Sequence, residues 1–238
     1  MADEFDCFDA IYATDLRYVP GCWEFCGDAH CCHFSRYRNY SPDRGQQKIP
    51  MLAGEYQYLE ARGYLQQYDD ITLELQTVES EGFSYVFETL SVAAEGCPCE
   101  QTTRPTLCRL YPLMPVFDAH GGVIDIDIEC TPFEIVEVLS GSPRACQIQT
   151  LSFAEMSNFL TLCAAVAASA RIKFSLMALH RAQVAFKQNL ERKMEQEKLS
   201  VFEALARLGQ EDALIDKPRL GTELRVLAEA FAQSGNVL

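Results

Sequence analysis

The chain has 238 residues, of which 34 are acidic and 20 are basic, so its formal net charge is −14 with histidine counted neutral. Hydrophobic residues make up 48% and charged residues 23%, a globular composition that excludes wholesale disorder. The negative charge also argues against a nucleic-acid partner, because an acidic surface repels phosphate.

The cysteine content is the unusual feature. There are 11 cysteines, an odd number, so they cannot all pair within the chain. Residues 1–6 are acidic and lack an apolar core, so we expect no secretory signal and a cytoplasmic location, where structural disulfides are rare. We also expect no membrane span, because the best candidate, residues 159–179, is interrupted by Arg171 and Lys173. Metal binding is the leading explanation of the thiols.

The first half of the chain predicts loops and hairpins. Residues 17–50 have no clean period and indicate a loop-rich segment, and residues 49–62 are typical of a short helix ended by Gly63. Residues 71–77 alternate between apolar and polar, and residues 83–89 are aromatic and β-branched. The Glu-Ser-Glu-Gly turn between them predicts a β-hairpin.

A second hairpin is expected from residues 110–117 and 123–128. Asp125, Asp127 and Glu129 would share one face of its second strand. They suit a solvated face, and acid–base groups or metal ligands are the alternative.

Helices dominate the rest of the chain. Capping boxes at Thr131, Ser152 and Ser200 predict three helix starts, the first with proline at the first helical position and Gly141 as its end. Residues 144–208 contain neither proline nor glycine, and one helix of that length would approach 100 Å. We therefore expect breaks near Ser169 and at Ser200. Residues 222–233 predict the last helix.

Together these elements predict an α+β fold with two parts. Residues 1–145 would form a loop-rich, metal-stapled domain with short antiparallel hairpins, and residues 146–238 a helical region packed on it. The negative charge and the cysteines are concentrated in the first part. Residues 1–140 hold 24 of the acidic residues, 8 of the basic residues and nine of the cysteines.

Two cysteine clusters supply the candidate metal ligands. Thiolates select Zn²⁺ or iron–sulfur clusters over Mg²⁺ or Ca²⁺. Seven thiols in two short runs do not resemble a packing pattern, so the predicted ligands are Cys22, Cys26, Cys31, Cys32, Cys97, Cys99 and Cys108. We expect core positions for Cys7 and Cys163. Whether Cys130, Cys146, His30 or His33 are ligands stays open.

Other residues near the clusters allow two interpretations. Trp23 is interpreted as an anchor of its segment. Arg104 and Arg109 are either salt-bridged surface residues or cations that offset the charge of several thiolates and lower their pKa values.

The clusters resemble a known family. Cys22-x3-Cys26-Gly27, Cys31-Cys32 and Arg104-Pro105-x2-Cys108-Arg109-x-Tyr111-Pro112 are similar to the YkgJ-type cysteine-cluster proteins, which are described as zinc- or iron-chelating. Residues 50–59 resemble a weaker element between the clusters. The resemblance covers about residues 20–115, and the gaps in the first cluster are longer here than in the family.

The resemblance implies a bound iron–sulfur cluster, of the 4Fe–4S type, or Zn²⁺. It extends to the cysteine-rich part of flagellin lysine methylases, which implies methyl transfer or another peptide modification. We therefore keep three functions: a metal-binding protein, a metal-dependent enzyme that acts on peptides, and an interaction protein whose metal is structural. An acidic surface would favour a basic protein partner. The amphipathic stripe of residues 175–199 is more typical of a core or a dimer seam.

Overall fold

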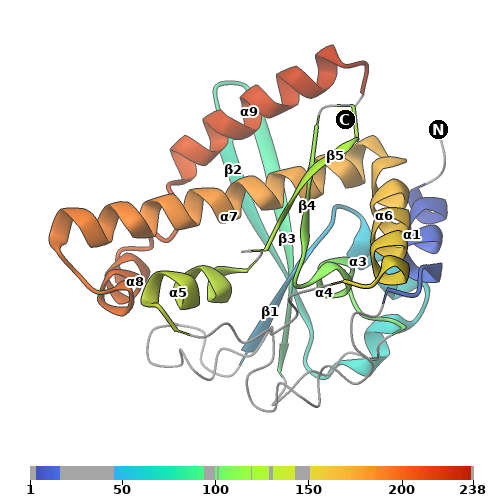
Figure 1. Ribbon diagram of the computed structural model, residues 1–238, viewed down its shortest axis with the longest axis horizontal. Coiled ribbons are helices and arrows are strands. Elements are labelled where there is room, and N and C mark those ends of the chain that lie inside the picture. Colours follow the sequence, from blue (N-terminus) through green and yellow to red (C-terminus); the bar gives the residue numbers. More distant parts are fainter. Residues whose placement is uncertain are drawn as a thin grey trace.

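The computed structural model describes residues 4–16, 46–93, 100, 102–118, 120–128, 131–142 and 151–236. Helices and two small antiparallel sheets alternate along the chain, so the α+β class is confirmed (Figure 1). The strands are β1 (Gln46–Met51), β2 (Thr72–Ser80), β3 (Phe83–Ala93), β4 (Met114–Phe117) and β5 (Val123–Asp127). The shorter helices are α1 (Glu4–Ala13), α3 (Glu55–Ala61), the 3₁₀ helix η2 (Tyr64–Gln67), α4 (Thr106–Leu110) and α5 (Pro132–Ser140). The C-terminal helices are α6 (Phe153–Ala167), α7 (Ala170–Glu197), α8 (Val201–Gln210) and α9 (Lys217–Gln233).

The larger sheet has the strand order β1–β3–β2, and all of its pairs are antiparallel. The expected hairpin is confirmed as β2 and β3, joined by a tight turn in which Gly82 has a φ of 78°. The helix expected over residues 49–62 is wrong in its first part. Ile49 lies in β1 and pairs with Leu90 of β3, because sheet pairing overrides local propensity there. The helix begins only at Glu55, and Gly63 follows it as expected, with a φ of 72°.

The second hairpin is formed by β4 and β5. Its first strand is shorter than expected, because Leu110 ends α4 and the strand starts at Met114.

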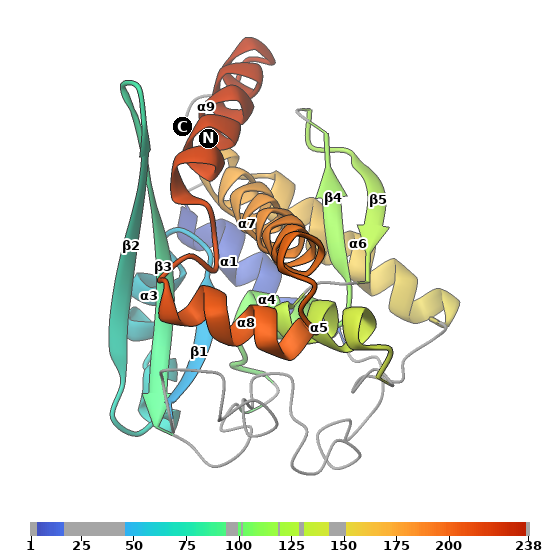
Figure 2. The same ribbon diagram turned by 90° about the vertical axis from the view of Figure 1, so that its left-hand side faces the viewer.

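Helix α7 is central to the molecule. Figure 2 views α7 nearly end-on, between the β1–β3–β2 sheet and the β4–β5 hairpin. The expected helix starts at residues 131, 152, 169 and 200 are confirmed, since Thr131, Ser152, Ser169 and Ser200 each accept a backbone N–H at the start of α5, α6, α7 and α8. The last helix begins earlier than expected, at Lys217 after the cap Asp216.

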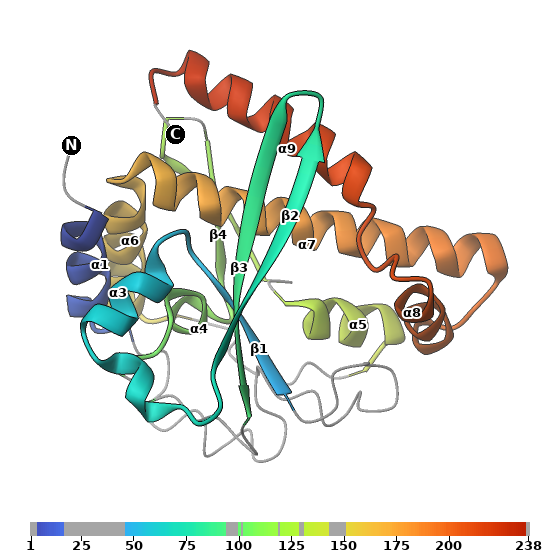
Figure 3. The same cartoon turned by 180° about the vertical axis from the view of Figure 1, so that it is seen from behind.

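The remaining helices cover the sheet and the two ends of α7. Figure 3 shows α3 and η2 beside the sheet, at the end of the molecule where α1 and α6 lie. Helix α1 packs against α6. Four aromatic rings of α1 and η2 surround the fully buried Tyr58 of α3. At the other end, α5 and α8 pack against α7.

Two hydrophobic cores hold the described residues together. The main core joins Phe8, Leu59 and Leu90 of the first half to Phe159 and Leu176 of the helical half. A smaller core is built from α5, α7 and α8, and includes Val136, Phe186, Leu190, Val201 and Leu208. The stripe on α7 is therefore core, as expected, because Leu176, Leu179, Phe186 and Leu190 are all buried.

In the described part of the chain, no single helix is both long enough and apolar enough to cross a membrane.

Candidate metal centre

Three of the cysteines lie in the described residues. Cys7 and Cys163 are 4% and 1% exposed, so their expected core positions are confirmed. Burial raises the pKa of the Cys163 thiol to about 12, so it stays protonated at neutral pH and is a poor metal ligand. Cys108 is different, because it is only partly buried. Of these three thiols, Cys108 is the one that a metal can reach.

A buried carboxylate fixes the helix that carries Cys108. Glu55, at the start of α3, is 0% exposed. Its Oε1 accepts hydrogen bonds from the backbone N–H and the hydroxyl of Thr106, both at 2.6 Å, and from the hydroxyl of Tyr12 at 2.8 Å. Its Oε2 accepts the N–H of Leu52 at 3.0 Å. Glu55 thus joins α1, the end of β1 and the first turn of α4.

The same carboxylate affects Tyr12. Burial raises the pKa of Tyr12 well above its usual range, and the negative charge of Glu55 raises it further. Tyr12 is therefore a neutral hydrogen-bond donor throughout the physiological pH range.

A buried arginine holds the other side of α4. Arg109 is 6% exposed, and its guanidinium donates to the carbonyl oxygens of Arg104 and Thr14 at 3.0 Å and of Thr102 at 2.5 Å. It also lies over the ring of Tyr12, 4.7 Å from the ring centre. Burial lowers the pKa of Arg109, and the charge of Glu55 partly opposes this effect. The interpretation of Arg109 as a salt-bridged surface residue is therefore wrong.

The first cysteine-bearing segment is flanked by a residue bound to α4 and by strand β1. Residues 17–45 carry the first cluster, and the chain enters this segment just after Thr14, whose carbonyl oxygen accepts from Arg109. The chain leaves the segment at Gln46, the first residue of β1, and β1 contacts α4.

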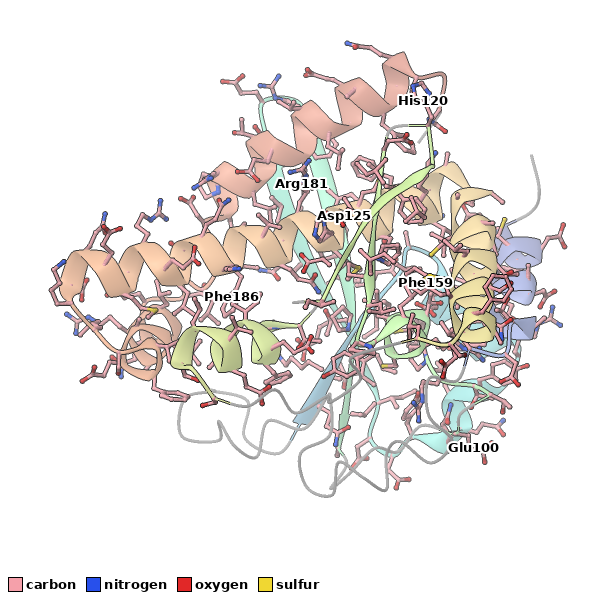
Figure 4. All side chains as sticks on the ribbon, viewed as in Figure 1. Glu100, His120, Asp125, Phe159, Arg181 and Phe186 are labelled. Carbon is pink, nitrogen blue, oxygen red and sulfur yellow. The ribbon has the colours of Figure 1, made fainter. Side chains whose placement is uncertain are left out.

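The second cysteine-bearing segment starts beside Gln46. Gln46 pairs directly with Ala93, the last residue of β3, and Cys97 and Cys99 follow Ala93 closely in the sequence. The chain is described again at Glu100, whose N–H donates to the side chain of Gln67 in η2 at 2.8 Å. Figure 4 shows Glu100 at the lower right, beside η2.

The remaining predicted ligands lie outside the described residues. They are Cys22, Cys26, Cys31, Cys32, Cys97 and Cys99. Cys130, Cys146, His30, His33 and Trp23 also lie outside. Within the described ranges, no group of three or more histidine, cysteine, aspartate or glutamate side chains could hold a metal ion.

The acidic strand face does not form a metal site within the described part of the chain. Asp127 of β5 pairs with His180 of α7, with Oδ2 and Nε2 3.2 Å apart. Asp125 is exposed on the same strand, and its carboxylate accepts the N–H of Ile126. Glu129, the third predicted member, lies outside the described residues.

Comparisons with known proteins identify no relative: no family model, no curated protein and no solved structure matches this chain.

Proposed function

We propose that the chain binds an iron–sulfur cluster or Zn²⁺ through cysteine thiolates, with Cys108 as one ligand and the two cysteine clusters supplying the others. One observation carries this proposal. The partly exposed Cys108 lies on a helix that is fixed by Glu55 and Arg109. Arg109 also holds the carbonyl of Thr14, just before the first cysteine-bearing segment, and Gln46 and Ala93, which flank the two segments, pair with each other.

Chain length keeps the first cysteine of each cluster near the described end of its segment. Cys22 is six residues beyond Leu16 and Cys97 is four residues beyond Ala93. Extended chains of these lengths span about 20 Å and about 14 Å. Cys22 therefore lies within about 20 Å of Leu16, and Cys97 within about 14 Å of Ala93.

The donor chemistry supports a soft metal. Thiolates bind Zn²⁺ and iron–sulfur clusters, whereas carboxylate and carbonyl oxygens suit Mg²⁺ and Ca²⁺. When bound, Zn²⁺ supplies a crosslink or a Lewis acid, and an iron–sulfur cluster supplies one-electron transfer. The chain's own contribution is the backbone at Cys108, which the hydrogen bonds of Glu55 and of the buried Arg109 hold in place.

The resemblance to zinc- or iron-chelating cysteine-cluster proteins supports the same proposal. The Arg-Pro-x-x-Cys-Arg-x-Tyr-Pro stretch, its most specific part, coincides with α4 and its flanks. The alternatives, a metal-dependent enzyme that modifies peptides and an interaction protein with a structural metal, stay predictions.

The test is elemental analysis of the full chain purified without oxygen. A brown protein with broad visible absorbance that dithionite bleaches would identify the iron–sulfur form, and a colourless protein with stoichiometric zinc would identify the zinc form. Cys108→Ser should lose most of the metal. Cys163→Ala, the matched control, should retain it because Cys163 is a core residue. Wild-type protein without stoichiometric iron or zinc would overturn the proposal, and equal metal contents in the two variants would overturn the role of Cys108.

A further inference from the structure

A cavity of about 290 Å³ lies between the β1–β3–β2 sheet and helices α5, α7 and α8. Its walls are mostly apolar and include Val78, Phe87, Val136, Leu179, Phe186 and Leu205. Figure 4 shows Phe186 on the stretch of α7 that lies beside α5. None of the residues described around Cys108 lines this cavity.

The cavity lies where the two hydrophobic cores meet. Val78, Phe87 and Leu179 belong to the main core, whereas Val136 and Phe186 belong to the smaller one. The residues of each core pack against one another, and the cavity lies between the two cores. Such a gap has the shape of a ligand site between packed units rather than of a small void inside one core.

The charges around the cavity are asymmetric. Among its lining residues, all of them described, Lys217 is the one charged side chain, although the chain as a whole carries −14. The ion pair of Lys217 with Asp212 is loose, at 3.5 Å, and Asp212 is 95% exposed. A solvated pair of this kind contributes little, so Lys217 is available for another anion.

The rim also opens toward a polar region. Ile215 and Lys217 line a neighbouring polar cleft of about 440 Å³ as well as the apolar cavity. A molecule seated in the cavity can therefore keep a polar head solvated at Lys217 while its apolar part is buried.

We propose that this cavity binds a medium-chain aliphatic carboxylate, with the tail among the apolar walls and the carboxylate at Lys217. The proposal is independent of the metal centre. A volume near 300 Å³ is at the small end of ligand pockets, which favours a chain of about ten carbon atoms over a two-chain lipid. Each added methylene should tighten binding about fourfold until the cavity is full.

The test is titration of the full chain with octanoate, decanoate, decanol and decylamine by calorimetry. Decanoate should bind saturably, more tightly than octanoate and at least fivefold more tightly than decylamine, which places a cation beside Lys217. Lys217→Met should weaken decanoate at least fivefold and leave decanol unchanged. Lys198→Met, a matched change at an exposed lysine outside the cavity, should alter neither ligand.

A second variant tests the location. Ala182→Phe fills the cavity from α7 and should abolish binding of decanoate and decanol, whereas Ala164→Phe on the exposed face of α6 should not. Circular dichroism confirms that each variant is folded. Absence of saturable decanoate binding up to about 1 mM, unchanged binding in folded Ala182→Phe, or decylamine binding equal to decanoate would each overturn the proposal.

Discussion

Glu55→Gln tests the arrangement that holds α4. The glutamine has one acceptor oxygen where the carboxylate has two. If that oxygen keeps the three bonds made by Oε1, the amide NH₂ faces the N–H of Leu52, and one buried donor loses its partner. An unsatisfied buried donor costs about 1–3 kcal/mol, and the loss of charge assistance on the other three bonds adds to this cost. We expect a loss of about 3 kcal/mol in the free energy of unfolding.

Urea denaturation followed by circular dichroism measures this loss. Glu60→Gln is the matched control, because Glu60 is an exposed residue of the same helix, and it should change stability by less than about 0.5 kcal/mol. A double-mutant cycle with Thr106→Val should give a coupling energy of about 1 kcal/mol or more, since valine lacks the Thr106 hydroxyl that donates to this carboxylate. Equal stabilities of the Glu55 and Glu60 variants would refute the reasoning.

Three further changes probe other parts of the fold. Gly221→Ala should destabilise the chain by about 1–3 kcal/mol in urea denaturation, because the new Cβ would overlap the backbone carbonyl of Glu79 and force α9 away from β2; an unchanged midpoint would contradict this contact. Glu155 and Glu203 have pKa values below the ordinary 4.5, chiefly because they accept hydrogen bonds from the serines that cap α6 and α8. The stability that these two carboxylates contribute is therefore complete above pH 4.5 and lost as the pH falls below it. Changing both to glutamine should flatten the decline of the thermal midpoint between about pH 5 and pH 3. An equally steep decline would count against this role of the caps. Burial lowers the pKa of Lys173 from 10.5, so stability should rise as the pH approaches that value, and Lys173→Met should remove the rise; a variant with the wild-type slope would show that Lys173 is not the source.

Local sequence signals predicted the elements that depend on local chemistry. The caps at Ser152, Ser169 and Ser200 determine helix starts through hydrogen bonds within three residues, so they can be recognised without a structure. The β2–β3 hairpin is likewise specified by its alternation and its turn. Strand β1 was missed because the residues of β3 with which it pairs lie 37 to 47 positions further along the chain. Helix α1 was missed because its buried face, formed by Cys7, Phe8 and Ile11, is too short to establish a period.

The surroundings of Cys108 could be predicted only in part. The motif identified Cys108 and Arg109 but not their environment, because a carboxylate and a guanidinium are normally exposed. The burial of Glu55 and Arg109 depends on donors and acceptors from α1 and from the chain before α4, which no pattern along the sequence brings together.

The pairing of Gln46 with Ala93 has a thermodynamic consequence. Residues 17–45 are anchored at Thr14 and at Gln46, so folding of the described core already brings the ends of this 29-residue segment to fixed positions. Closing a flexible segment of that length costs about 3 kcal/mol of chain entropy. Under the proposed function, metal binding would not have to meet this cost again, so more of the intrinsic thiolate affinity would remain as net affinity. If the proposed function holds, the two cores of the described residues would form before the metal binds, and the metal would add to their stability rather than create the fold.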